Sequence, residues 1–258
     1  MDAVRKILGR TMRTKIFQIT HREIDEPLWN DDLYDSVQVG NAEQFANHRD
    51  TECEGSLAEW NPIYCEQTGV YWVWKEGSKD LDVVGICQYR RRLKFVDQNE
   101  VEKIIKNYDC ILPTPLKMNC SVYQQYCVCH SSSDMELAEK IIYEKFNDLK
   151  EGWDAYVRNG KVLYYSGSFV MRKEDFDAWC AFYFAFAEEF LRRKGWSSVD
   201  VAKSKIRAQM NVGSRRSPRG LDYQSFVLAF LAERLLTMWV QVKFKNRYEM
   251  PYTKFDGV

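Results

Sequence analysis

Short apolar segments of strand length alternate along this chain with longer stretches of helical character. The clearest are residues 14–20 (TKIFQIT) and 83–89, and each ends in polar or basic side chains. Strands that alternate with helices favour a mainly parallel sheet with helices packed on its faces. Ligands of open α/β sheets bind beyond the carboxyl ends of the strands. We therefore predict an α/β fold whose binding edge carries Thr20, His21 and Arg22.

Other segments extend this pattern over most of the 258 residues. Further strands are expected at 37–40, 110–112 and 162–171, and helices at 62–75, 100–107, 134–149, 173–191 and 223–242. We predict a leader at 1–13, one domain at 14–245 and a tail at 246–258. Residues 192–219 are rich in Arg, Lys, Gly and Ser, and we expect them to form a basic excursion from the compact domain.

The overall charge and hydropathy disfavour two classes of partner. The 37 basic and 37 acidic side chains cancel, so no net field recruits nucleic acid or a membrane. No apolar run reaches the roughly 18 residues that a spanning helix needs, and the opening residues lack the apolar core of a signal peptide. We expect a cytoplasmic protein with at most peripheral membrane contact. Nucleic-acid binding by residues 192–219 is a remote alternative that requires an affinity falling steeply with salt.

The eight cysteines lie mainly within apolar segments, where a thiol behaves as a small hydrophobic group. This placement indicates free thiols in a reducing compartment rather than a disulfide framework. The tightest Cys/His cluster is Cys127, Cys129 and His130, and it lacks the second ligand pair that a structural zinc site requires. We predict no metal there.

Residues 59–75 (EWNPIYCEQTGVYWVWK) combine aromatic and polar side chains in a segment that we expect to be helical. Glu59 and Glu66 are seven residues apart and would share one face, while Asn61 and Thr68 would share another. A buried helix whose carboxylates merely cap or pair is one interpretation. The regular spacing of two carboxylates, an amide and a hydroxyl favours the other, a helix that lines a polar cavity of the size of a sugar.

Residues 85–93 (GICQYRRRL) end a strand in three consecutive arginines. Guanidinium groups bind phosphate through charge-assisted, often bidentate hydrogen bonds. Arg90 and Arg91 can therefore clamp a diphosphate at the ligand edge. The alternative is a solvated strand end whose arginines pair with nearby aspartates.

An Asp-x-Asp pair, Asp80 and Asp82, is of the kind that holds a metal ion in many sugar transferases. Both residues precede the strand at 83–89 and would lie at its amino end, away from the ligand edge. We therefore predict no metal at this pair and no other cofactor. A divalent metal would need other ligands, and arginine can neutralise a leaving diphosphate instead.

Several motifs in a fixed order resemble the DUF4422 family. They are the run from Asp50 through EGSLAEWNPIYCEQTGVYWVWK, then VGICQYRRRL, YDCILP, VYQQY, SFVMRKEDFDAWC and AERLLTMW, and the resemblance covers about residues 14–245. Members occur in bacterial capsule and O-antigen clusters and look like GT-A glycosyltransferases; characterised members are galactofuranosyltransferases. The resemblance implies a single GT-A-like domain with a Rossmann-like nucleotide-binding sheet.

The chain departs from the usual family strings at two places. Gln88 stands where G-L-C-H-Y-R-R has histidine, so it cannot act as a general base or imidazole ligand. Leu57 and Ala58 replace Ile-Ser, which removes a hydroxyl. These departures allow a changed donor, a changed acceptor or a weakened activity.

The resemblance implies transfer of a hexosyl group, such as galactofuranosyl, from a UDP-sugar to an oligosaccharide or lipid-linked glycan. Glu66 is the first candidate for the base that deprotonates the acceptor, followed by Glu59, Asp50 and Glu233. Expected contacts with the donor come from Thr20, His21, Arg22, Asn61, Thr68, Tyr71, Trp72, Gln88, Tyr89, Arg90 and Arg91, with Trp72 or Tyr71 stacked on the sugar. A nucleotide-sugar-binding module without turnover is the main alternative.

Overall fold

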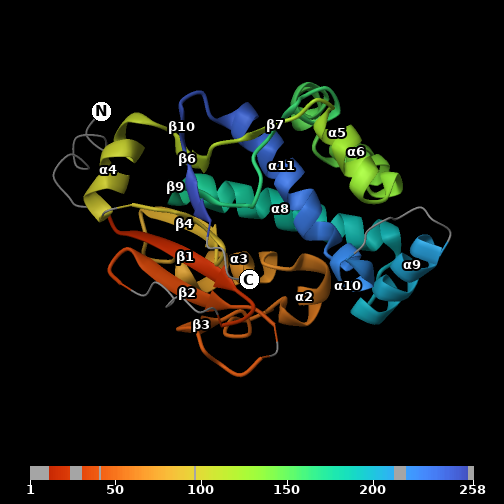
Figure 1. Ribbon diagram of the computed structural model, residues 1–258, viewed down its shortest axis with the longest axis horizontal. Helices are drawn as coiled ribbons and strands as arrows, with labels where there is room; N and C mark the ends of the chain where they lie inside the picture. Colours follow the sequence, from red (N-terminus) through yellow and green to blue (C-terminus); the bar gives the residue numbers. More distant parts are fainter. Residues whose placement is uncertain (1–11, 24–30, 41, 96, 212–218, 255–258) are drawn as a thin grey trace.

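The computed structural model describes residues 12–23, 31–40, 42–95, 97–211 and 219–254. Within these ranges a nine-stranded sheet forms the centre of the molecule, with helices packed on it (Figure 1). The leader predicted at 1–13 lies almost entirely outside the described residues. No helix in the described ranges combines the length and apolar character needed to cross a membrane.

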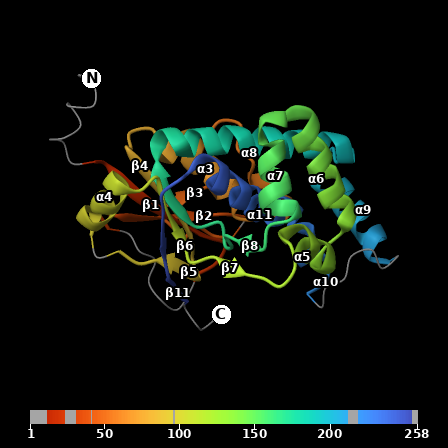
Figure 2. The same cartoon turned by 90° about the horizontal axis from the view of Figure 1, so that it is seen from above.

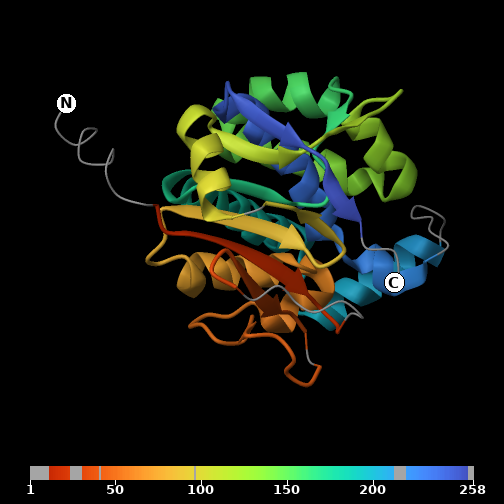
Figure 3. The ribbon, with the colours of Figure 1, turned by 60° about the vertical axis from the view of Figure 1, so that its left-hand side comes forward.

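One half of the sheet is parallel. The strands β4 (Val83–Gln88), β1 (Thr14–Thr20), β2 (Tyr34–Gln38) and β3 (His48–Arg49) follow one another in the same direction. Figure 3 shows the red β1 beside the gold β4 at the centre of this twisted sheet. These pairings confirm the predicted mainly parallel α/β fold, and they bring the carboxyl ends of four strands to one edge.

The other half of the sheet is mixed. Strand β9 (Phe169–Arg172) runs antiparallel to both β4 and β6 (Cys110–Pro113), and β10 (Arg247–Met250) runs parallel to β6. Because β9 is reversed, its amino end meets the carboxyl ends of its neighbours. The loop that precedes β9 therefore reaches the ligand edge as well.

Strand β1 is buried on both faces because its apolar residues alternate between two cores. Phe17 and Ile19 belong to the larger core cluster and Ile16 to the smaller one. Gly85 on neighbouring β4 has no room for a side chain, since a Cβ there would lie 2.7 Å from Cγ1 of Ile16. Near-continuous apolar strands are what a sheet covered on both faces requires, and this explains why β1 and β4 were recognisable in the sequence.

The helices divide between the two faces. The larger core joins the sheet to α2 (Asn61–Tyr64), α3 (Gln67–Trp72), α8 (Lys173–Lys194) and α11 (Val227–Lys243). The smaller core lies under α4 (Gln98–Asn107). The long helices α8 and α11 carry most of the buried aromatic and aliphatic side chains of the larger core.

A helical lobe is inserted between β6 and β9. It consists of β7 (Leu116–Lys117), α5 (Val122–Cys129), α6 (Ser132–Lys145), α7 (Lys150–Trp153) and β8 (Val162–Leu163). These helices lie together to one side of the sheet (Figure 2). The strand predicted at 162–171 is therefore two strands, β8 and β9, separated by a loop that contains Ser166 and Gly167 with positive φ.

The segment at 59–75 is not the single helix that the sequence predicts. A 3₁₀ turn (Ala58–Trp60) leads into α2, the chain turns at Cys65, and α3 continues into a π-helical turn (Val73–Gly77). Cys65 has φ 51°, a left-handed conformation that is strained for a residue with a side chain. The side-chain amide of Asn61 fixes this turn by donating to the Cys65 carbonyl at 2.9 Å.

Part of the segment expected as a tail at 246–258 pairs with the sheet. Strand β10 extends the sheet beyond β6, and β11 (Tyr252–Lys254) pairs antiparallel with β5 (Arg91–Leu93). Within the expected basic excursion, Arg192 to Lys194 end α8, and α9 (Val199–Asn211) is a regular helix that packs on α10 (Gly220–Ser225). Residues 212–218 of that segment lie outside the described residues.

Candidate functional site

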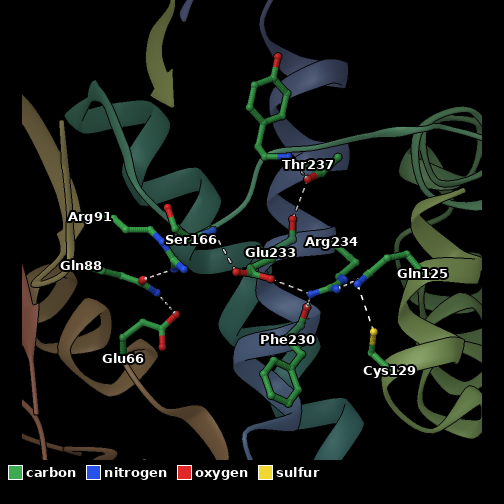
Figure 4. A network of polar contacts seen from close by, with 11 residues as sticks. Glu66, Gln88, Arg91, Gln125, Cys129, Ser166, Phe230, Glu233, Arg234 and Thr237 are labelled. Carbon is green, nitrogen blue, oxygen red and sulfur yellow. Dashed lines mark hydrogen bonds and ion pairs between the residues drawn. The ribbon is translucent and has the colours of Figure 1, made fainter. Parts of the chain in front are cut away.

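A cavity of about 610 Å³ opens at the carboxyl edge of the parallel strands. The sheet side of its lining comprises His21, Arg22, Val39, Asn61, Cys65, Glu66, Gln88, Tyr89, Arg90 and Arg91. The opposite side comes from the lobe and from α10 and α11. Figure 4 shows Glu66, Gln88 and Arg91 on one side, with Glu233 and Arg234 on α11 across from them.

Glu66 is held at the cavity by its turn and by a short relay of hydrogen bonds. It directly follows the strained Cys65 turn, and its Oε1 accepts a hydrogen bond from Nε2 of Gln88 at 3.2 Å. Oε1 of Gln88 accepts in turn from Nη1 of Arg91 at 3.1 Å. Burial raises the pKa of the Glu66 carboxyl above its ordinary value, and the nearby Glu233 charge adds to this. A carboxylate with a raised pKa at a cavity is suited to act as a general base.

Glu233 presents a second carboxylate to the same cavity. Its Oε1 accepts from the backbone N–H of Ser166 at 2.9 Å, and its Oε2 accepts from Nη1 of Arg234 at 2.7 Å. Ser166 belongs to the loop before β9 and has φ 80°, so strained backbone lies on both sides of the cavity. Arginine and the backbone donor offset the cost of placing this charge in a largely buried position.

A group of cations surrounds Tyr89 at the end of β4. The guanidinium of Arg90 lies 5.1 Å from the ring centroid and that of Arg22 lies 5.8 Å from it. The ring of His21 meets Tyr89 edge-on at 5.0 Å. Burial lowers the pKa of His21, and the charges of Arg22 and Arg90 lower it further, so the imidazole is held neutral near pH 7. The arginines therefore supply the positive charge at this end of the cavity.

Arg91 is positioned separately from Arg90. Its guanidinium lies 4.3 Å from the ring centroid of Tyr165, which also lines the cavity. Together with the hydrogen bond to Gln88, this contact fixes the Arg91 side chain. The sequence did not indicate Tyr165, because nothing in the segment after β8 shows which side chain the loop turns inward.

Two aromatic residues expected to stack on a sugar lie elsewhere. Trp72 is buried, stacks on His48 with ring centroids 4.6 Å apart, and donates from Nε1 to the Glu52 carbonyl at 3.2 Å. Tyr71 meets Phe184 edge-on at 4.9 Å. Neither lines the cavity. The sugar contacts expected of Tyr71 and Trp72 assumed a single helix over residues 62–75, and the turn at Cys65 divides that segment into two helices.

Asp50 and Thr68 do not line the cavity, but a chain of hydrogen bonds links them to Asn61, which does. Asp50 is fully buried, and its Oδ2 accepts a hydrogen bond from Oγ1 of Thr68 at 2.6 Å. Oγ1 of Thr68 accepts from Nδ2 of Asn61 at 3.2 Å, and Asn61 lines the cavity. Burial raises the pKa of Asp50. Asp50 does not line the cavity, so the geometry makes it a positioning residue rather than a base.

The remaining candidates are outside the cavity lining. Thr20 is buried and its hydroxyl donates to the Arg22 carbonyl at 2.6 Å, which shapes the turn that presents Arg22. Glu59 is exposed in the 3₁₀ turn. Both lie close in sequence to lining residues, but their side chains do not reach the cavity.

The Asp-x-Asp pair lies at the amino end of β4, as expected. Asp80 and Asp82 each pair with Arg13 at 3.8 Å, and neither lines the cavity. Over the part of the chain that the structure describes, no three His, Cys, Asp or Glu side chains gather as a metal site would require. His130 packs on Phe230, and its Nδ1 lies 3.1 Å from Oε1 of Gln224.

Comparison with known proteins yields two similarities. Residues 15–246 match the family model described as a domain of unknown function (DUF4422). The fold is similar to an apo structure of the WbbM bifunctional glycosyltransferase, with a TM-score of 0.72 and 19% sequence identity, over 95% of this chain and 45% of that chain. The chain thus spans less than half the length of that structure. The sequence matches no curated protein.

Proposed function

The chain belongs to the DUF4422 family, and from that premise we propose that it is a glycosyltransferase that moves a hexosyl group from a UDP-sugar to a glycan hydroxyl. One observation carries the proposal: a carboxylate with a raised pKa shares a cavity with an arginine-rich strand end at the ligand edge of the sheet. A galactofuranosyl donor and an acceptor from a surface polysaccharide, reached from the cytoplasm, are the finer parts of the proposal.

The sheet side of the cavity receives the donor diphosphate. Arg22, Arg90 and Arg91 lie there, and their guanidinium groups provide charge-assisted donors for phosphate oxygens. Positive charge fixed in place before the reaction stabilises the negative charge that develops on the leaving nucleoside diphosphate. A divalent cation could share this work only through ligands other than Asp80 and Asp82, which lie at the amino end of β4.

Glu66 serves as the base. Its carboxylate takes the proton of the acceptor hydroxyl, the hydroxyl oxygen bonds to the anomeric carbon, and the bond from that carbon to the diphosphate breaks. Gln88 holds the carboxylate in position and links it to Arg91, one of the cations that bind the leaving group. Proton removal and departure of the diphosphate are thereby supported by one hydrogen-bonded relay.

A thermal-shift panel of UDP-, GDP-, CMP- and dTDP-sugars, each with and without Mg²⁺ or Mn²⁺, tests the donor. A donor at about one hundred times its Kd stabilises the folded state by about 2.7 kcal/mol, which for a chain of this size raises Tm by roughly 5 °C or more. We expect that response from UDP-sugars. A larger response from another nucleotide would replace UDP, and a response that requires the metal would reassign part of the phosphate binding to a cation.

Arg90→Ala tests the phosphate site directly. A hydrogen bond to a charged group contributes about 1.5–3 kcal/mol, so the Kd for UDP measured by calorimetry should rise about 10- to 100-fold. Arg207→Ala, an exposed arginine on α9 outside the cavity, is the matched control and should bind UDP as the wild type does. Equal affinity in both variants would place the diphosphate elsewhere.

Gln88 is the reason for a second candidate function, that of a nucleotide-sugar-binding protein without turnover. Its amide donates to Glu66, which favours the charged carboxylate and opposes the rise in pKa caused by burial. Donor binding by calorimetry without transfer to any glycan and without slow donor hydrolysis would support this candidate. Gain of hydrolysis in Gln88→His would identify Gln88 as the cause.

A further inference from the structure

The wall of the cavity that faces away from the sheet includes a group of aromatic side chains. Tyr223 on α10 and Phe230 on α11 are half-buried and line the cavity. Phe230 stacks on His130 with ring centroids 4.0 Å apart and planes 22° apart, and Tyr223 lies 5.0 Å from Phe230 at 52°. The rings are therefore fixed against one another before any ligand arrives.

A charged pair lies beside these rings. The side chain of Glu233 is 16% exposed and that of Arg234 is 4% exposed. Arg234 is held by the Phe230 carbonyl at 2.9 Å and by Oε1 of Gln125, and it holds Glu233 in turn (Figure 4). Each carboxylate oxygen of Glu233 accepts one hydrogen bond from the Ser166 N–H or from Arg234. Since a carboxylate oxygen can accept two, both retain capacity for a ligand.

We propose that Tyr223, Phe230 and Glu233 form a subsite for a neutral sugar ring of the acceptor. This inference rests on the proposed transferase function and adds where the acceptor binds. The C–H face of a sugar ring packs on aromatic rings, and its hydroxyl groups donate to a carboxylate. The wall offers both surfaces side by side, across the cavity from the arginines that face the donor.

Other ligands fit this wall less well. A phosphate or carboxylate would lie beside the negative charge of Glu233, and like charges repel in a partly buried position. The adjacent cation Arg234 is already engaged by Glu233, Gln125 and the Phe230 carbonyl. The other cation of this wall, Arg219, is exposed and lies 4.8 Å from the Tyr223 ring centroid. An acyl chain would cover Glu233 and Arg234 without replacing their contacts with water, which is unfavourable for charged groups. A sugar ring avoids both costs.

The carboxylates of Glu66 and Glu233 have different roles in such a site. Glu66 removes a proton, whereas Glu233 accepts hydrogen bonds from the hydroxyl groups of the sugar. Substitution of Glu233 by glutamine should therefore raise the KM for the acceptor. It should keep the acid limb of the pH profile but move it to lower pH, because the Glu233 charge contributes to the raised pKa of Glu66. Substitution of Glu66 should instead lower kcat.

Saturation-transfer NMR with octyl β-D-galacto-, gluco- and mannopyranosides, each below its critical micelle concentration and with UDP present, tests the subsite. For at least one of them we expect ring protons to receive more saturation than the octyl methyl group.

In Phe230→Leu the loss of an aromatic face should raise the Kd of that glycoside about two- to tenfold. In Glu233→Gln the loss of a charged acceptor should raise it about tenfold or more. Phe146→Leu is the matched control, because Phe146 is half-buried against Phe182 and does not line the cavity.

The outcomes separate the two proposals. Absence of binding by all three glycosides, saturation mainly at the octyl methyl group, or wild-type affinity in both variants would overturn the sugar subsite. An equal loss in Phe146→Leu would also overturn it, since the effect would then be general. Failure of UDP to bind in calorimetry, with glycoside binding lost in the two variants as expected, would leave the subsite standing and remove the proposed donor chemistry.

Discussion

Glu66, the proposed base, lies in an environment that is unfavourable for a charged carboxylate. Burial raises its pKa, so the folded protein binds the Glu66 proton more tightly than the unfolded chain does. Between the ordinary and the raised pKa, the unfolded chain therefore loses this proton first. It follows that the contribution of Glu66 to stability falls as pH rises through that window, and it stays unfavourable at neutral pH.

Glu66→Gln should consequently separate activity from stability. We expect kcat to fall about 10²- to 10⁴-fold, the usual contribution of a general base, while Tm at neutral pH stays equal or rises. The difference in Tm should vanish below the ordinary carboxyl pKa, where both side chains are neutral. Activity assays and thermal melts between about pH 4 and 8 measure both effects. A variant that keeps full turnover would place the base elsewhere.

Asp50 should behave as a positioning residue. In Asp50→Asn an oxygen can still accept from Thr68, so we expect kcat/KM within a few-fold of wild type. Thr68→Val removes the hydroxyl that joins Asp50 to Asn61. Loss of about 1–2 kcal/mol of hydrogen bonding should lower kcat/KM about 5- to 30-fold with an unchanged pH profile. A loss in Asp50→Asn as large as that in Glu66→Gln would contradict this assignment.

Side chains that are near in sequence to a strand end were predicted best. Gln88, Tyr89, Arg90 and Arg91 follow a recognisable apolar strand, and strand ends of a parallel sheet share one edge. Trp72 was expected at the cavity on the assumption of an unbroken helix through Cys65, and it lies outside the lining. A positive φ at a cysteine depends on the Asn61 contact in the folded chain, and residue preference alone gives no sign of it.

At the scale of the element, β5 depends on a strand from the far end of the sequence. It pairs with β4 through a single described register position, Gln88 with Arg91, and with β11 over three residues. Most of the backbone pairing that orients Arg91 therefore comes from β11. This contact joins the proposed diphosphate site to β11.

Thr253→Pro tests that dependence. Proline removes a backbone donor and fixes φ within a strand, so we expect weaker β5 pairing, a lower Tm and a several-fold higher Kd for UDP. Thr253→Ala keeps the backbone donor and serves as the control at the same position. Calorimetry and thermal melts on both variants provide the comparison. Equal UDP affinity in the two variants would show that β5 is held without β11.

The strands of this sheet differ in how well the sequence predicts them. Strands β1 and β4 were predicted because both faces are buried and their sequences are apolar. Strand β10, with the sequence RYEM, has no buried residue, and β11 is three residues long. Their conformation is decided by pairing with β6 and β5, so local sequence carries little signal for them.

For the whole molecule, basic and acidic side chains balance in number, and several of the basic ones also lie next to an acidic partner. Arg192 and Arg193 pair with Glu189 at 2.7 Å and 2.6 Å, and Lys194 pairs with buried Asp134 at 2.8 Å. The three cations at the start of the basic segment that the sequence singled out are thus paired with neighbouring acids. A nucleic acid would have to compete with these pairs for the same side chains.

We therefore expect no appreciable binding of DNA or RNA. Fluorescence anisotropy with labelled single- and double-stranded 20-mers, at about 50 and 150 mM salt, measures this. Binding through phosphates would weaken steeply over that range. A submicromolar affinity at the higher salt would show that the described ion pairs do not limit access to the basic residues.

The lobe between β6 and β9 has a consequence for how such chains diversify. These strands are adjacent and antiparallel, with Cys110 opposite Met171, so residues 114–168 leave the sheet and return to it at neighbouring points. That is the topology of an inserted module, and insertions between nearby ends leave the host fold intact. The module supplies Leu116, Gln125, Cys129, His130, Leu163 and Tyr165 to the cavity. A different insertion between β6 and β9 would therefore change these lining residues together, whereas the strand ends that carry the arginines lie outside the inserted segment.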